Sequence, residues 1–160
     1  MTRNQKPESA NQQAMNAAVR ILTRRDHTRF EVRQKLKQRG FSTGAIKAAV
    51  AECERLNYID DERTTRIYIG QLVRRGFGFR RIALELQKKG LRGSNVEDIL
   101  RQQQIEIDER EIARRVLQKK MKSFEREADP QKRRDKLYHF LDYRGFSRSI
   151  ISELLREYNK

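Results

Sequence analysis

The chain has 160 residues, a formal net charge of +15 and a pI of about 10.4. Hydrophobic residues make up 36% of it and charged residues 37%. This composition argues against one thick core and suits a series of small cores. Such basicity predicts a polyanionic partner: nucleic acid first, then an acidic protein surface or an anionic membrane.

Several features place the protein in a soluble, reducing compartment. No apolar run approaches the roughly 18 residues that a membrane-spanning helix needs. The polar N-terminus lacks the apolar core of a signal peptide. A single cysteine, Cys53, excludes an internal disulfide. We therefore expect a cytoplasmic monomer that binds no membrane.

The first part of the chain predicts a tail followed by three helices. Residues 1–13 are polar and predict a flexible tail. A helix is expected from about Ala14 to Arg25. The run Thr28-Arg29-Phe30-Glu31 fits a capping box and starts a second helix that ends at Gly40. Ser42 is the expected N-cap of a third helix.

Later start and stop signals predict six more helices. Three acids at Asp60-Asp61-Glu62 favour a helix N-terminus, and Gly76-Phe77-Gly78 breaks the helix that follows. Ser94-Asn95-Val96-Glu97 reads as a second capping box, and Asp108 with Glu111 opens the next helix. Asp129-Pro130 is a strong start signal, with an acceptor at the N-cap and proline at N1. We find no strand pattern.

Three helix endings share one pattern, in which a glycine that can adopt positive φ follows a leucine by four residues and precedes a large apolar residue. The glycines are Gly40, Gly90 and Gly145, which lie 50 and 55 residues apart. The pattern fits a Schellman stop, and its recurrence indicates a helical repeat. The fold class we predict is all-α, an elongated tandem array of three three-helix repeats with helix-turn-helix-like units. The predicted boundaries are 1–13 for the tail, then 14–57, 58–106 and 107–160 for the three repeats.

The central repeat resembles the RecX family of recombinase regulators. Asn57-Tyr58-Ile59-Asp60-Asp61-Glu62-Arg63 and Arg75-Gly76-Phe77-Gly78, followed by Arg81-Ile82, Glu85-Leu86 and Lys89-Gly90, carry the resemblance. One departure is Thr64-Thr65, where the family usually has an aromatic residue and alanine. The resemblance implies binding to the RecA filament on single-stranded DNA. It also implies inhibition of strand exchange, ATP hydrolysis and co-protease activity, and thus modulation of homologous recombination, DNA repair and the SOS response.

The sequence offers no catalytic, cofactor or metal site. His27 and His139 lie far apart, and we expect His27 in an exposed turn and His139 on a helix surface. Cys53 continues an apolar helix face and is expected to be a buried or half-buried small residue. Gly76-Phe77-Gly78 lacks the pattern of a phosphate loop. We therefore predict a protein that is not an enzyme.

Basic residues are the candidate binding site, because repeats place equivalent positions along one surface. The strongest candidates bracket the Gly76–Gly78 turn, where guanidinium groups could pair with phosphate or carboxylate. Phe77 or Phe79 could stack on an unpaired base, although both are more often packing residues. The predicted basic stripe consists of Arg24, Arg25, Lys35, Arg39, Arg74, Arg75, Arg80, Arg81, Lys88, Lys89, Arg92, Lys119, Lys120, Lys132, Arg133 and Arg134.

Two other functions remain open at the level of sequence. A helix–glycine turn–helix unit resembles the DNA-binding helix-turn-helix, so a regulator of transcription that binds double-stranded DNA is the alternative. The helix after Gly40 is apolar, however, and looks packed. Weak binding to single- or double-stranded DNA without sequence preference is the third possibility.

Overall fold

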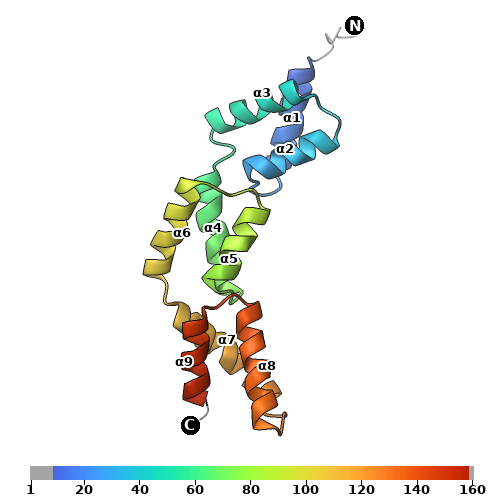
Figure 1. Ribbon diagram of the computed structural model, residues 1–160. Coiled ribbons are helices and arrows are strands. Elements are labelled where there is room, and N and C mark those ends of the chain that lie inside the picture. The colour runs from blue at the N-terminus through green and yellow to red at the C-terminus, as the bar shows by residue number, and fades with distance from the viewer. Residues whose placement is uncertain (1–8, 159–160) are drawn as a thin grey trace. The chain divides into compact units, whose positions relative to one another are not determined.

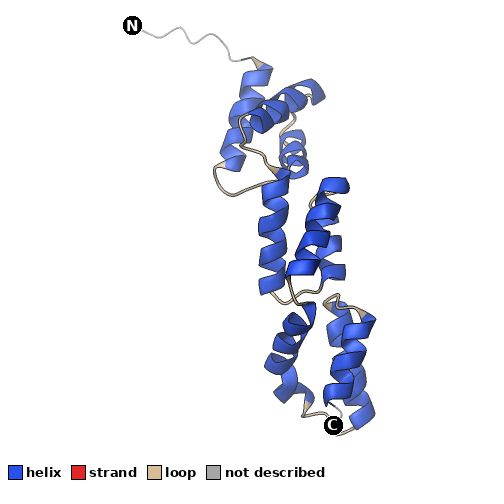
Figure 2. Ribbon diagram, turned by 90° about the vertical axis from the view of Figure 1, so that its left-hand side faces the viewer, coloured by secondary structure: helices blue, strands red, loops and turns tan. Residues whose placement is uncertain are grey.

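The computed structural model describes residues 9–158 of the chain, and all its regular structure is helical (Figures 1 and 2). Within this range the nine predicted helices are all present, and no strand occurs. The helices are α1 (Ala10–Leu22), α2 (Arg29–Gln38), α3 (Thr43–Arg55), α4 (Asp61–Arg74), α5 (Phe79–Lys88), α6 (Ser94–Glu106), α7 (Glu109–Phe124), α8 (Pro130–Tyr143) and α9 (Arg148–Tyr158). The all-α prediction is confirmed.

The contacts within the chain form two compact units. Unit 1 contains the described residues up to Thr65 together with Lys89–Leu91, and unit 2 contains Arg66–Lys88 and the residues from Arg92 onward. The boundary falls inside α4, so the units do not follow the predicted repeat borders. The division into three repeats at those borders stays a prediction.

Each unit has its own apolar core. In unit 1, α1 packs on α3, α2 packs on both, and Ile59 after α3 joins the same cluster. Cys53 belongs to this core, as predicted, and burial raises the pKa of its thiol. In unit 2, a second cluster joins α7, α8 and α9, in which Leu117, Leu141 and Phe146 are fully buried.

The repeated helix endings have the geometry that their sequence predicts. Gly40, Gly90 and Gly145 have φ values of 82°, 74° and 85°. At Gly40, the amide of Phe41 donates to the carbonyl of Leu36 at 3.3 Å, which closes a Schellman motif. Phe146 N–H donates to Leu141 O at 3.2 Å in the same way.

Two further helices end through the same motif. Gly76 has φ 79°, and Phe77 N–H donates to Leu72 O at 3.1 Å. Asn57 has φ 56°, and Tyr58 N–H donates to Cys53 O at 2.8 Å. Asparagine tolerates this left-handed conformation better than most side chains, so it serves where the other four turns use glycine.

Several helix starts follow the predicted signals. The capping box at Thr28 and Glu31 is present, Ser42 accepts from Ala45 N–H, and Asp129 precedes Pro130 at the start of α8. The capping box predicted at Ser94 is wrong. Gly93, with φ 103°, is the N-cap of α6 and supplies no side-chain hydrogen bond. The positive φ of Gly93 turns the chain one residue earlier, so that Ser94 is already helical.

The first helix also differs from its predicted limits. It begins at Ala10, because Ser9 Oγ accepts a hydrogen bond from Gln12 N–H at 3.3 Å and caps the helix. Part of the predicted tail is therefore helical, and residues 1–8 lie outside the described residues. The helix ends at Leu22 rather than Arg25, and Thr23 Oγ1 donates to Arg20 O at 3.0 Å just beyond it.

Two predictions about polar residues have opposite outcomes. His139 is exposed on α8, as expected. His27 is only 4% exposed, so the predicted exposed turn residue is wrong. Its Nδ1 lies 2.8 Å from Arg25 O, and burial lowers the pKa of the ring.

Thr65, where the sequence departs from the RecX pattern, is fully buried and donates its hydroxyl to Asp61 O at 2.6 Å.

Candidate functional site

The turn between α4 and α5 lies in backbone contact with the turn after α8. Gly78 N–H donates to Arg144 O at 2.8 Å, and a Cβ on Gly78 would lie 2.5 Å from Gly145 O. A Cβ on Gly145 would in turn lie 2.3 Å from the backbone nitrogen of Arg81. Only glycine permits such an approach. The contact brings together two segments of unit 2 that each carry arginines.

Three guanidinium groups gather around the half-buried ring of Phe77. Their central carbons lie 5.1 Å (Arg75), 5.8 Å (Arg81) and 5.6 Å (Arg144) from the ring centroid. These distances allow cation–π attraction. We call Arg75, Arg80, Arg81 and Arg144 the arginine cluster.

Arg144 is a half-buried member of the cluster. Its Nη1 donates to Arg75 O at 2.9 Å and to Gly76 O at 3.1 Å. Burial lowers the pKa of Arg144, and the charge of Arg75 lowers it further. The guanidinium nevertheless stays charged, because arginine is not deprotonated in proteins. Its hydrogen bonds fix the α4–α5 turn against the end of α8.

Arg80 and Arg81 have partners in the fold. Arg80 donates to Asp142 Oδ1 and to Phe146 O, each at 3.1 Å. Arg81 Nε lies 2.9 Å from Glu85 Oε1, and Lys88 also reaches that carboxylate at 3.0 Å. Arg75 is exposed, and its guanidinium lies over the ring of Phe77. Of the four predicted residues that bracket the turn, Arg75 and the exposed Arg74 are thus the most available to a partner.

A carboxylate from α7 caps the start of α5 beside the cluster. Phe79 N–H donates to Glu109 Oε1 at 2.8 Å. Burial raises the pKa of Glu109, although the hydrogen bond from Phe79 and the charge of Arg80 act in the opposite direction. Phe79 itself is only 3% exposed, so it is a packing residue and not a surface for stacking.

The start of α2 in unit 1 is held by equivalent contacts. Arg29 N–H donates to Asp61 Oδ1 at 2.9 Å, as Phe79 N–H does to Glu109. Thr28 Oγ1 donates to Lys89 O at 2.8 Å, where unit 2 has the bond from Gly78 N–H to Arg144 O. The sequence positions correspond, since Lys89 and Arg144 each precede a repeated glycine. The same arrangement of contacts therefore holds the start of α2 in unit 1 and the start of α5 in unit 2.

The other predicted basic residues form two groups: those that bind another residue of the chain, and those that are exposed. Arg25 and Lys89 both bind Glu31, at 3.2 and 2.9 Å, and support the fold of unit 1. Arg133 donates twice to Glu127 O, at 2.8 and 3.0 Å, and Arg92 donates to Gln87 O at 3.5 Å. The exposed remainder consists of Arg24, Lys35 and Arg39 in unit 1 and Lys119, Lys120, Lys132 and Arg134 in unit 2. One continuous stripe across all of them stays a prediction.

Two groups of basic residues were absent from the predicted stripe. Arg144 belongs to the arginine cluster. The sequence feature that could have identified it is the basic residue that precedes each repeated glycine. Arg29, Arg33 and Lys37 line a groove on α2. Their signal was a spacing of four residues, which places side chains on one face of a helix.

Other site classes lack support within residues 9–158. There, no three His, Cys, Asp or Glu side chains are grouped so that they could hold a metal ion. None of the helices in this range is both long and apolar enough to cross a membrane. Within these residues, the charged side chains that gather into clusters are basic.

Comparisons with known proteins identify the family. The sequence model described as "RecX, first three-helix domain" matches residues 14–53, and that described as "RecX, third three-helix domain" matches residues 108–155. The regulatory protein RecX of Legionella pneumophila is 37% identical over 145 residues, which cover 90% of this chain and 93% of that protein. The regulatory protein RecX of Vibrio parahaemolyticus is 36% identical over 151 residues, 94% of this chain and 95% of the relative.

A solved structure agrees in fold. The crystal structure of RecX from Lactobacillus salivarius matches with a TM-score of 0.79 at 23% identity, and the match covers 92% of this chain and 96% of that one. With the helices, the glycine turns and the motifs of the central repeat, these matches lead to one conclusion: the chain belongs to the RecX family of regulatory proteins.

Proposed function

We propose that this protein binds the filament that the RecA recombinase forms on single-stranded DNA and inhibits its activities. These are strand exchange, ATP hydrolysis and co-protease activity, so the protein modulates homologous recombination, DNA repair and the SOS response. We also propose that it acts in the cytoplasm as a monomer, without enzymatic chemistry of its own.

The observation that carries the proposal is the arginine cluster. Four guanidinium groups lie within one pair of turns, in a chain whose net charge is +15. A net charge of about 2 to 8 is enough for the solubility of a small domain. Arg75, the exposed member of the cluster without an ion pair, suits pairing with phosphates or carboxylates, and a nucleoprotein filament offers both.

The alternative, a regulator that reads double-stranded DNA, gains no support from α3. This helix follows the first repeated glycine, where a recognition helix would lie. It buries Ala45, Ile46, Ala49 and Val50 in the core of unit 1. Its exposed positions are Thr43, Gly44, Lys47, Ala48, Ala51 and Arg55, of which the central Ala48 and Ala51 offer no polar group to a base edge and Arg55 is paired with Glu52.

Inhibition of ATP hydrolysis by the cognate RecA on single-stranded DNA tests the function. Substoichiometric amounts of the protein should suppress hydrolysis strongly. Arg75→Ala removes an exposed guanidinium without touching an ion pair of the fold, and it should raise the half-inhibitory concentration about ten-fold. This factor corresponds to the loss of one hydrogen bond between charged groups, about 1.5 kcal/mol.

Arg148→Ala, an exposed arginine of the same unit outside the cluster, is the matched control and should stay within about two-fold of the parent. Absence of inhibition by the parent protein would overturn the function. If the Arg75→Ala variant has the same half-inhibitory concentration as the parent, Arg75 does not belong to the binding site. The proposed function would still stand.

A further inference from the structure

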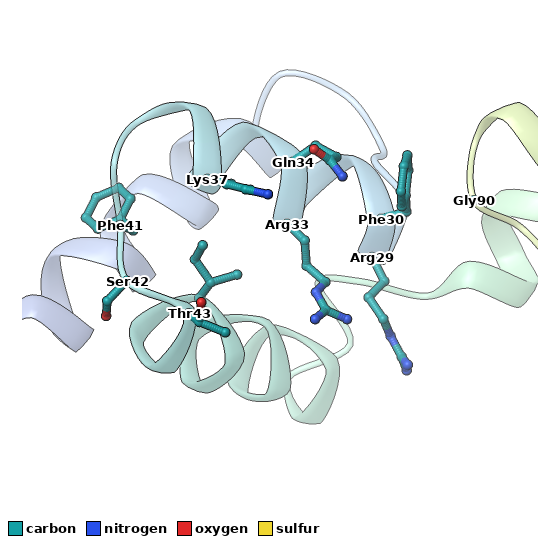
Figure 3. A pocket seen from close by; sticks show the side chains of 10 residues that line it. Arg29, Phe30, Arg33, Gln34, Lys37, Phe41, Ser42, Thr43 and Gly90 are labelled. Carbon is teal, nitrogen blue, oxygen red and sulfur yellow. The ribbon is translucent and has the colours of Figure 1, made fainter.

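Unit 1 contains a cationic groove between α2 and the start of α3 (Figure 3). Its volume is about 680 Å³, and its lining contains three basic side chains and no Asp or Glu. In Figure 3, Arg29 and Arg33 extend from α2 in the same direction. Lys37, also on α2, lies across the groove from Thr43. We call this the α2 groove.

The cations of the α2 groove form a regular row. Arg29, Arg33 and Lys37 are four residues apart, which corresponds to steps of about 6 Å along the helix axis. Arg29 is paired with Glu54. Arg33 and Lys37 are exposed, and neither side chain has a hydrogen bond or an ion pair with any described residue. Two open positive charges therefore lie next to each other in the groove, with no carboxylate in its walls.

An aromatic ring borders the same groove. Phe30 is 44% exposed, although its base packs closely on the turn at Gly90, where an added Cβ would lie 2.3 Å from Phe30 Cβ. Phe41 lines the groove too and is half-buried. The close packing fixes the position of Phe30 and leaves part of its ring free.

We propose that the α2 groove binds a segment of single-stranded nucleic acid. Arg33 and Lys37 pair with successive phosphates, and a base stacks on Phe30. Proteins that bind single strands without sequence preference combine a cationic track with exposed aromatic rings in this way. An acidic peptide would use the charges but would have no need of the ring. The biological role of this site rests on the proposed function, whereas the binding can be measured without the recombinase.

The probe is a fluorescently labelled oligothymidylate, and its binding to the full chain is followed by anisotropy between about 50 and 200 mM salt. Each phosphate contact on a single strand contributes about 0.7 to the slope of log K against log[salt]. Arg33→Gln/Lys37→Gln should therefore reduce the slope by about 1.4. At about 0.1 M salt this corresponds to roughly 25-fold weaker binding, if affinities converge near 1 M.

Phe30→Leu isolates the stacking contribution. Leucine keeps an apolar side chain against Gly90 but has no aromatic face. The affinity should fall about five-fold or more, as for the loss of one base–aromatic stack, while the salt slope stays the same. The matched control is Lys47→Gln/Arg148→Gln, which removes the same net charge at exposed helix positions outside the groove. It should weaken binding by much less than the groove pair.

Circular dichroism of each variant shows whether it is folded. Equal weakening in the groove pair and the control pair would mean that charge alone acts, and it would overturn the site. An unaffected Phe30→Leu variant, together with competition by polyglutamate as strong as by the oligonucleotide, would assign the groove to an acidic peptide and overturn the proposal. Failure of the parent protein to inhibit the recombinase would overturn the proposed function, and these binding results would stand.

Discussion

Replacing Glu31 by glutamine should destabilise unit 1 by about 2 kcal/mol at neutral pH. Glu31 Oε1 accepts from Lys89 Nζ at 2.9 Å and from Arg25 at 3.2 Å, while Oε2 accepts from Thr28 N–H at 3.0 Å. Glutamine retains one acceptor oxygen for the capping bond. It loses the negative charge that holds the two cations.

The magnitude follows from the pKa of Glu31. Burial raises this pKa, but hydrogen bonds from Lys89, Thr28 and Arg25 outweigh burial and lower it from 4.5 to about 2. At about 1.36 kcal/mol per pKa unit, the carboxylate contributes at most about 3.4 kcal/mol. Arg25 is 53% exposed, and solvent screens its share, so about 2 kcal/mol is expected.

The sign of the pH dependence follows from the lowered pKa. A carboxyl group that binds its proton more weakly in the folded state stabilises that state at all pH values above its unfolded pKa. This contribution is lost as the pH falls from about 5 towards about 2. The stability difference between the parent and Glu31→Gln should shrink over the same range.

Urea denaturation followed by far-UV circular dichroism at a series of pH values measures this difference. Glu52→Gln is the control, because Glu52 pairs with Arg55 on the surface of the same unit, and it should change the midpoint little. A Glu31→Gln variant as stable as the parent at neutral pH would refute the role of the Lys89–Glu31–Arg25 contacts. So would a difference that persists unchanged at pH 2.

Two other predictions concern the glycine turns and the buried histidine. Gly145→Ala should cost more than about 3 kcal/mol in thermal or urea denaturation, because alanine at φ 85° is strained and its Cβ would lie 2.3 Å from a backbone nitrogen. Gly44→Ala, in α3 with open space around it, should instead stabilise by about 0.5–1 kcal/mol; equal effects would contradict the close approach. An NMR titration should place the pKa of His27 below 6.5, so that its protonation destabilises the fold as the pH falls below that value; a pKa of 6.5 or higher would contradict its burial.

The sequence predicted helix starts and ends reliably where the signal lies within one or two turns of the helix. The capping box at Thr28, the N-cap at Ser42 and the glycine stop at Gly40 each depend on residues within one or two turns of helix. The backbone there has few alternatives, so residue type and spacing predict the conformation. The failure at Ser94 was also local, since a glycine directly before the expected cap could adopt a conformation that serine could not.

Contacts between distant segments were beyond the sequence. Asp61 was predicted only to favour the start of its own helix, and Glu109 was assigned no role, yet each accepts the first amide of another helix about 30 residues earlier. Arg80 read as an open cation and is bound to Asp142. Nothing in the spacing of these residues identifies their partners. The sequence therefore identified the basic residues but could not show which of them are paired within the fold and which are available to a partner.

The groups that cap α2, α5 and α8 are synthesised at different times relative to the helices that they cap. The first amides of α2 and α5 are bound by Asp61 and Glu109, which leave the ribosome only after those helices do. Helix α8 differs, because Asp129 just before it accepts from Gln131 N–H at 2.8 Å and from Lys132 N–H at 3.3 Å. A nascent chain that stops short of Asp61 would thus have the Thr28–Glu31 capping box of α2 but lack the acceptor for the Arg29 amide. Helix α8, in contrast, has Asp129 as its cap within the segment that forms it.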